Sequence, residues 1–155
     1  MRDIGRITYA SDFSPASLVA LPHALRLARI ARAVLTIVHV LPSPRALFIE
    51  GGYVPQEVWD QTRADAAKEM DRLVQQAVNA GVRATATIVD EGNAVPADAI
   101  VRAAEDAKTD VLVLGTHGRT GITRLILGSV AARVVATASC PVLTVRASGA
   151  SESSS

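Results

Sequence analysis

The sequence contains very little cysteine and few aromatic residues. One cysteine, Cys140, occurs in 155 residues, so an internal disulfide is impossible and a reducing compartment is expected. Aromatic residues make up only 3% of the chain, so its core must be built from Ala, Val, Leu and Ile. Because Cys140 directly precedes Pro141 and an apolar strand, we expect a buried and unreactive thiol.

Long apolar runs are also lacking. No run reaches the length of a membrane span, and the first residues, which include Asp3, lack the apolar core of a signal peptide. We therefore expect a cytoplasmic protein. The net charge of +1 argues against nucleic acid or a membrane surface as the main partner. The length predicts one domain, which we place at residues 1–146. Residues 147–155 are rich in Ser and have nothing apolar to anchor them, so we expect a disordered tail there.

Several catalytic and nucleotide-binding motifs are missing. No GxxxxGK[ST] occurs, which excludes a P-loop NTPase, and no GxGxxG follows the first expected strand. A GxSxG nucleophile motif is absent too. The three histidines share no metal-ligand spacing: we expect His23 at the surface and His39 in a structural role, and only His117 lies in a glycine-rich loop.

What is present centres on residues 111–130, VLVLGTHGRTGITRLILGSV. Four branched apolar residues run into Gly115, as in a strand buried on both faces. Gly118 follows in the loop, and Gly128-Ser129 begins an apolar-periodic segment. A strand, a glycine loop and a helix start are the arrangement of a phosphate-binding site. The alternative is a plain strand-to-helix connection with a glycine turn and Ser129 as N-cap.

Acidic residues are missing from the same region. None occurs between Asp110 and Glu152, whereas four arginines do, so a basic excess is concentrated there. A site for a polyanionic ligand would need such a local excess. The arginines are Arg119, Arg124, Arg133 and Arg146. The alternative explanation is that a buried strand and an Ala-rich helix leave few places for Asp or Glu.

Strands and helices alternate along the chain. We expect strands at residues 4–9, 34–40, 82–88, 111–114 and 142–145, and helices at 14–32, 56–80, 96–107 and from 129 onward. Pro22 lies inside the first helix and should kink it. The alternating strand 82–88 should be half-exposed at a sheet edge. Residues 41–55, rich in Pro and Gly, should form a mobile surface loop.

This alternation predicts an α/β fold, an open five-stranded parallel sheet with helices on both faces and right-handed crossovers. If the strand order is 3-2-1-4-5, the winding reverses between strands 1 and 4, and ligands bind at the carboxyl ends of the strands there. The loops that begin at Ala10-Ser11-Asp12 and at Gly115 would meet at that point. Fold and glycine spacing therefore indicate the same crevice.

The glycine spacing resembles a known motif. Gly115-x2-Gly118-x9-Gly128-Ser129 matches G-x2-G-x9-G-[S/T] of the ATP-binding branch of the universal stress protein family. The resemblance extends to YASDFS at 9–14, VHV at 38–40 and CPVLTVR at 140–146. It implies a Rossmann-like domain, similar to the adenine nucleotide alpha hydrolases, with strand order 3-2-1-4-5. It also implies ATP binding, often with Mg²⁺ or Mn²⁺, and a role as a stress-responsive regulator.

The resemblance also implies which residues contact the nucleotide. Ala10 and Asp12 would lie beside the adenosine, and the backbone of Val40 would meet adenine. The full set is Ala10, Ser11, Asp12, Val40, Leu114, Gly115, His117, Gly118, Arg119, Gly128, Ser129 and Val130, of which the last six from His117 onward would hold the triphosphate. Ala10 replaces a proline common in the family. Asp12 could instead cap an ordinary Asx turn before Ser14.

The last strand predicts an interface. Strand 142–145 would form a sheet edge, whose unpaired backbone groups are a template for pairing. In the resembling family the fifth strands pair antiparallel, so Val142, Leu143, Thr144 and Val145 are the expected homodimer contact. The alternative is an edge protected by the tail or by nearby loops.

Taken together, these features favour an ATP-binding homodimeric regulator whose nucleotide orders the loop 115–128 and changes the surface shown to a protein partner. Two alternatives stay open. One is a slow ATPase or self-phosphorylating protein, with His117 or Ser129 near the γ-phosphate, although no general base or water-positioning Gln is visible. The other is a nucleotide-independent dimerisation or chaperone-like module.

Overall fold

The computed structural model of the protein describes residues 2–43, 53–90, 92, 94–117 and 127–147. Five parallel strands form one sheet in the order β3-β2-β1-β4-β5, as predicted. They are β1 (Arg6–Ala10), β2 (Val34–Val40), β3 (Ala84–Val89), β4 (Val111–Gly115) and β5 (Val142–Val145). The chain winds one way from β1 to β3 and the other way from β4 to β5, so the switch point lies between β1 and β4.

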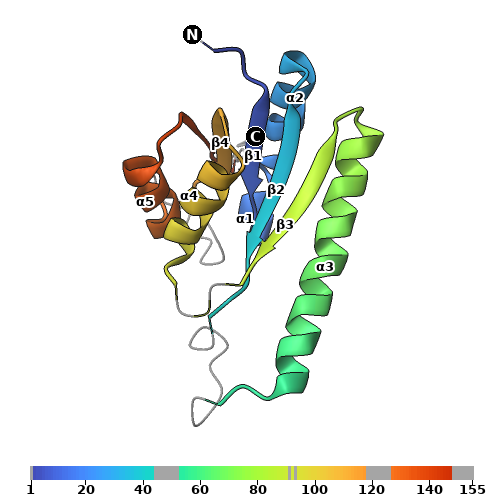
Figure 1. The fold of residues 1–155 in the computed structure, drawn as a ribbon, viewed down its shortest axis with the longest axis vertical. Coiled ribbons are helices and arrows are strands. Elements are labelled where there is room, and N and C mark those ends of the chain that lie inside the picture. Colours follow the sequence, from blue (N-terminus) through green and yellow to red (C-terminus); the bar gives the residue numbers. More distant parts are fainter. Residues whose placement is uncertain (1, 44–52, 91, 93, 118–126, 148–155) are drawn as a thin grey trace, which may run out of the picture.

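The helices cover both faces of the sheet (Figure 1). They are α1 (Pro15–Leu18), α2 (Leu21–Ala31), α3 (Gln56–Asn79), α4 (Pro96–Asp106) and α5 (Ser129–Thr137). Side chains of α2 and α3 pack on one face in a core with Ile7, Leu35 and Ile37. Side chains of α4 and α5 pack on the other face with Leu112 and Leu114. Because the central strands are covered on both sides, most of their residues are apolar and buried on both faces, with Thr8 and His39 as buried polar exceptions.

The first helical segment is two helices and not the single kinked helix that we predicted. α1 ends at Leu18 and α2 begins at Leu21, which places Pro22 in the first turn of α2. A proline is tolerated there because the first N–H groups of a helix have no acceptor within it. The start of α1 is as predicted: Ser14 is its N-cap and its side chain accepts a hydrogen bond from the Ser17 N–H.

The strand β3 lies at one edge of the sheet, as predicted. Its exposure is greater than the alternating pattern suggested, because Ala86 and Ile88 are exposed as well as the two threonines. The helix α3 contacts β3 but ends just before it, and Gly81 follows in the left-handed conformation with φ of 78°. That conformation is why a glycine ends this helix.

Two further predictions concern exposed segments. Most of the loop 41–55 lies outside the described residues, but its first residue, Leu41, is buried and donates its N–H to the Val89 carbonyl oxygen at 2.9 Å. His23 is exposed, as predicted. Among the helices that the structure describes, none is long and apolar enough to cross a membrane.

Candidate functional site

A cleft of about 330 Å³ opens at the carboxyl ends of β1, β2 and β4, beside the first turn of α5. We refer to it as the carboxyl-end cleft. Ten of the twelve predicted site residues line it: Ala10, Ser11, Asp12, Val40, Leu114, Gly115, His117, Gly128, Ser129 and Val130. The other two, Gly118 and Arg119, lie outside the described residues, as does Arg124. The turns at residues 12 and 115 therefore meet at the switch point.

The loop after β1 carries Asp12 into the cleft on a tight turn. The Asp12 carboxylate accepts hydrogen bonds from the Ser14 N–H at 2.9 Å and from the Ser14 hydroxyl at 2.5 Å. The Asx turn that we considered as an alternative thus exists, and the residue that forms it also lines the cleft. The next residue, Phe13, has φ of 65°, a left-handed conformation that is uncommon for a side chain of this size.

Buried hydroxyl groups join this loop to α1. The hydroxyls of Ser11 and Ser17 lie 3.0 Å apart, and the Ser11 hydroxyl accepts the Phe13 N–H at 3.1 Å. Tyr9, fully buried in β1, donates its hydroxyl proton to the Ser17 carbonyl oxygen at 2.9 Å. Burial raises the pKa of Tyr9 above its usual value, so this hydroxyl remains a donor at neutral pH.

The residue His39 is structural, as predicted, and lies directly behind the loop. It is 3% exposed in β2, its Nδ1 lies 2.8 Å from the Ser11 carbonyl oxygen, and its ring stacks on Phe13 with centroids 4.1 Å apart. His39 itself does not line the cleft, whereas the next residue, Val40, does. Neighbouring residues of a strand point to opposite faces of the sheet, which explains this difference.

Two glycines allow the backbone to pack closely at the cleft. A Cβ atom at Gly115 would lie 2.6 Å from the Ala16 carbonyl oxygen of α1. A Cβ atom at Gly128 would lie 2.7 Å from the Thr116 carbonyl oxygen, which accepts the Gly128 N–H at 2.7 Å. Thr116 and Gly128 thereby join the two ends of the segment between β4 and α5. Both glycines have a packing role, whatever else they do.

The N-terminus of α5 faces the cleft. Gly128, not Ser129, is its N-cap, and no side chain caps it. The alternative of Ser129 as N-cap is therefore wrong, because Ser129 is the first helical residue. The first hydrogen bond to the Gly128 carbonyl comes from the Ala132 N–H at 2.8 Å. The N–H groups of Ser129 and Val130 therefore have no acceptor within the helix, and the positive end of the helix dipole lies at the cleft.

The imidazole of His117 lines the cleft at the end of the described part of this segment. Its Nδ1 lies 2.9 Å from the Thr116 hydroxyl. Its Nε2 is buried and has no hydrogen-bond partner among the described residues. A buried polar atom without a partner costs free energy, so a ligand group that reached Nε2 would remove that cost.

The chemistry of the cleft combines apolar walls with neutral hydrogen-bond donors. Asp12 is the one carboxylate among the described lining residues, and no lysine or arginine accompanies it there. No group of three potential metal ligands occurs in the part of the chain that the structure describes. The cleft thus suits a ligand with an apolar or aromatic part, a hydrogen-bonding part and an anionic end at α5.

Seven lining residues were absent from the prediction, namely Ser17, Leu41, Pro42, Ser43, Pro96, Thr116 and Ala131. Thr116 lies between two predicted residues and could have been included for that reason. Pro96 begins α4, just after β3, so the rule that ligands bind at the carboxyl ends of strands could have found it. Nothing in the sequence marks Ser17, whose role depends on tertiary packing.

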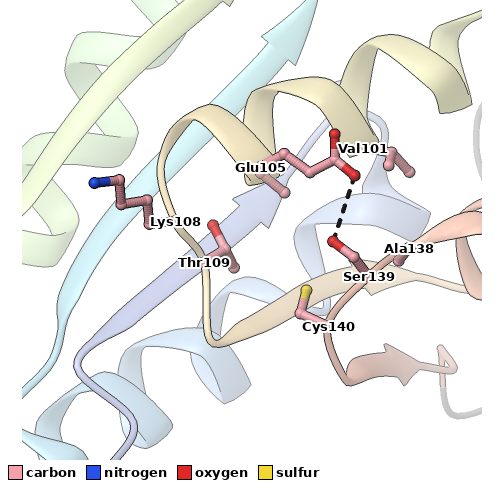
Figure 2. Close-up of a pocket in the computed structure, with 8 residues that line it drawn as sticks. Val101, Glu105, Lys108, Thr109, Ala138, Ser139 and Cys140 are labelled. Atoms are coloured by element: carbon pink, nitrogen blue, oxygen red, sulfur yellow. Dashed lines mark hydrogen bonds between the residues drawn. The ribbon is translucent and has the colours of Figure 1, made fainter.

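A second, smaller hollow of about 170 Å³ lies at the opposite end of the sheet (Figure 2). We refer to it as the amino-end hollow. It is lined by the last turns of α4, by Ala138, the C-cap of α5, and by the residues that precede β4 and β5. Ser139 donates to Glu105 at 3.4 Å across it, and the Cys140 thiol lies beside them. Cys140 is half-buried rather than buried as predicted, and burial raises the pKa of its thiol.

Comparison with known proteins identifies the family. The model of the universal stress protein family matches residues 4–146. The chain belongs to the universal stress protein family. It is 35% identical over 144 residues to the universal stress protein MJ0531 of Methanocaldococcus jannaschii, covering 91% of this chain and 81% of that protein. The resemblance described above is thereby confirmed at the level of the family.

Solved structures of universal stress proteins share the fold. The structure of MJ0577, also from Methanocaldococcus jannaschii, superposes with a TM-score of 0.82 at 26% identity and covers 96% of this chain and 100% of that one. A universal stress protein solved in complex with cAMP superposes with a TM-score of 0.66 at 26% identity, covering 95% of this chain and 100% of that one. That relative therefore binds an adenine nucleotide.

Proposed function

We propose that this protein binds ATP in the carboxyl-end cleft and acts as a homodimeric, stress-responsive regulator. One observation carries the proposal: ten residues selected from the sequence for contact with a nucleotide line a single cleft at the switch point of the sheet. An α/β fold of this kind binds its ligands there. The relative in complex with cAMP supports an adenine nucleotide as the ligand class.

In this proposal the phosphates bind at the first turn of α5. The N–H groups of Ser129 and Val130 and the Ser129 hydroxyl donate to the phosphate oxygens, and the positive end of the helix dipole favours their charge. His117 Nε2, buried without a partner among the described residues, supplies a further group for a phosphate. Gly118 and Arg119, outside the described residues, keep their predicted place at the triphosphate.

The adenosine binds at the other end of the cleft. Val40 ends β2 and Leu114 lies in β4, the two strands on either side of β1. The backbone of Val40 meets the adenine ring, and Leu114 provides an apolar contact near it. Asp12 accepts hydrogen bonds from the ribose hydroxyls or the adenine amine. Ser14, two residues further along, donates two hydrogen bonds to one Asp12 carboxylate oxygen, and these bonds hold the Asp12 side chain in one orientation. A rigid acceptor loses little conformational entropy when a ligand binds.

A divalent cation would enter together with the phosphates. The described part of the cleft offers Asp12 as its one carboxylate, too few protein ligands for a cation site without nucleotide. Mg²⁺ or Mn²⁺ would therefore bind mainly to phosphate oxygens and water. ATP affinity should rise with Mg²⁺, whereas Mg²⁺ alone should produce no binding heat.

Isothermal titration with ATP tests the proposal, with Gly128→Ala as the decisive variant. The added Cβ meets the Thr116 carbonyl oxygen, so the start of α5 must shift and its donors must move. We expect ATP affinity to fall at least about tenfold, equivalent to about 1.4 kcal/mol. Gly5→Ala, near the other end of β1, is the matched control and should bind normally, because the nearest atom to its added Cβ is Asp110 Oδ2 at 3.8 Å, an ordinary contact. Wild-type affinity in Gly128→Ala would contradict the phosphate assignment.

Dimerisation through β5 is the second part of the proposal. β5 is an edge strand of the described sheet, so its outer backbone groups pair with no strand among the described residues, and Leu143 is 39% exposed beside them. A second copy pairing antiparallel would satisfy these groups and cover the leucine. Val142, Thr144 and the buried Val145 complete the edge. ATP would regulate a partner to the extent that it favours one conformation of the loop 115–128 over another.

The variant Leu143→Asp tests the dimer. Its carboxylate would be buried unpaired in a β5 interface, so we expect a monomer by sedimentation equilibrium where the wild type is a dimer. Ile30→Asp is the control, since Ile30 is 74% exposed on α2 and lies outside β5. A monomeric wild type, or a dimeric Leu143→Asp protein, would contradict the assignment of the interface.

A further inference from the structure

The side chain of His39 contacts both residues that flank Asp12. Its Nδ1 lies 2.8 Å from the Ser11 carbonyl oxygen, before Asp12, and its ring stacks on Phe13, after Asp12, at 4.1 Å with an interplanar angle of 22°. Since His39 is 3% exposed within β2, a strand of the central sheet, these two contacts connect the loop to a rigid element.

The hydrogen bond to Ser11 defines which imidazole nitrogen of His39 carries a proton. A carbonyl oxygen can only accept, so Nδ1 must carry the proton and donate to Ser11. A side chain of the same size without a donor at that place would leave the Ser11 carbonyl oxygen without this bond. A buried carbonyl that loses its partner is destabilised where it lies.

The loop needs such support because its conformation is unfavourable. Phe13 has φ of 65°, and a bulky residue holds this conformation only where its surroundings compensate for the strain. The Phe13 N–H donates to the Ser11 hydroxyl at 3.1 Å, and the ring is held by His39. Both contacts fix the direction in which the backbone leaves Asp12, and hence where its carboxylate lies in the cleft.

We propose that His39 is a positioning residue for nucleotide binding: without lining the cleft, it holds Asp12 in place through Ser11 and Phe13. This inference depends on the proposed function. A positioning role differs from a general role in folding, because His39 then affects ATP affinity through one side chain, that of Asp12. The consequence is that mutations of His39 and of Asp12 are coupled in their effect on ATP affinity.

Two variants separate the two contacts. His39→Phe keeps an aromatic ring for Phe13 but removes the donor, whereas His39→Asn keeps an amide nitrogen near the position of Nδ1 but removes the ring. We expect His39→Phe to weaken ATP binding about tenfold by isothermal titration, and His39→Asn to recover part of that loss. Ile37→Val, on the same face of β2 and fully buried, should lower the thermal midpoint and leave the affinity unchanged.

A double-mutant cycle decides whether the effect passes through Asp12. In an Asp12→Ala background, His39→Phe should cost almost no further affinity, because the carboxylate that it misplaces is gone. Amide hydrogen exchange is an independent readout: the Ser14 N–H, which donates to Asp12, should exchange faster in both His39 variants without ATP. This readout remains available from His39→Asn should His39→Phe fail to fold.

The outcomes distinguish the inference from the proposed function. If the wild type does not bind ATP, both are overturned. If the wild type binds ATP and His39→Phe binds it equally well, the inference alone is overturned. An equal loss in the wild-type and Asp12→Ala backgrounds, or a similar loss in Ile37→Val, would also overturn it, because His39 would then act on the cleft as a whole.

Discussion

The two ends of the central sheet differ in the sign of charge that they suit. At the carboxyl end, the cleft is bordered by the first turns of α4 and α5, through Pro96 and Ser129. At the amino end, the hollow is bordered by the C-terminal ends of the same two helices, through Glu105 in α4 and Ala138, the C-cap of α5. Helix N-termini favour anions and helix C-termini favour cations.

This difference in charge preference between the two ends follows from the fold rather than from the choice of side chains. In a parallel sheet each crossover helix runs antiparallel to its strands, so all crossover helices start at the carboxyl end. The described part of the carboxyl-end cleft has no lysine or arginine, yet it presents N–H donors and a positive dipole end. An anion site can therefore be built here from backbone groups, with side chains serving mainly to shape it.

Backbone packing also differs between the two ends. A Cβ atom at Gly115, at the end of β4, would meet backbone at 2.6 Å, whereas one at Gly5, before β1, would find its nearest atom, Asp110 Oδ2, at 3.8 Å. The cleft is thus surrounded by closely packed backbone and tolerates little change, while the amino end near Gly5 has room. Three predictions test this contrast.

The largest effect is expected for Gly115→Ala. Its Cβ would overlap the Ala16 carbonyl oxygen of α1, so the helix or the end of β4 must move, and the free energy of unfolding should fall by about 2 kcal/mol. Gly5→Ala should change the free energy of unfolding by less than about 0.5 kcal/mol. Urea denaturation of both variants measures the difference. An equal loss of unfolding free energy in Gly115→Ala and Gly5→Ala would show that the backbone is packed alike at the two ends of the sheet.

A smaller, pH-dependent effect is expected for Asp110→Asn at the amino end. The Asp110 carboxylate accepts the N–H groups of Gly5 and Arg6, each at 2.9 Å, and these bonds lower its pKa in the folded protein. A lowered pKa stabilises the fold above the unfolded value of about 3.9, and that contribution is lost as the pH falls through the folded value.

The wild type should therefore exceed Asp110→Asn in unfolding free energy at pH 7, by less than about 1 kcal/mol because the site is open to solvent. The difference should shrink as the pH is lowered below 4. Denaturant titrations at several pH values measure it, and ATP affinity at pH 7 should be unchanged. A difference that grows on acidification would contradict the sign of the shift.

The smallest effect is expected at Cys140. Because burial raises the pKa of its thiol, iodoacetamide should modify it more slowly at neutral pH than it modifies a free cysteine, and faster as the pH rises. Saturating ATP should leave the rate unchanged, since the thiol lines the amino-end hollow and not the cleft. Protection by ATP, measured by mass spectrometry of the alkylated protein, would show that the two ends are linked.

Much of the cleft could be predicted from the sequence because its residues lie where strands end. The apolar run into Gly115 and the turn at Asp12 mark two strand ends, and the strand order brings them together. Predictions that depended on local geometry were less accurate. Pro22 was expected to kink one helix, and nothing in its local pattern shows that α1 stops at Leu18.

The alternation of apolar strands and amphipathic helices predicted a parallel α/β sheet, because hydrophobic periodicity depends on residues that are close in the sequence. The strand order, which brings together the two loops of the cleft, came from the family resemblance and was confirmed by the structure. Tertiary structure alone decided that His39 supports both neighbours of Asp12, and that Gly115 and Gly128 have no room for a side chain. These contacts join residues from different elements, and their distances arise only when the elements pack together.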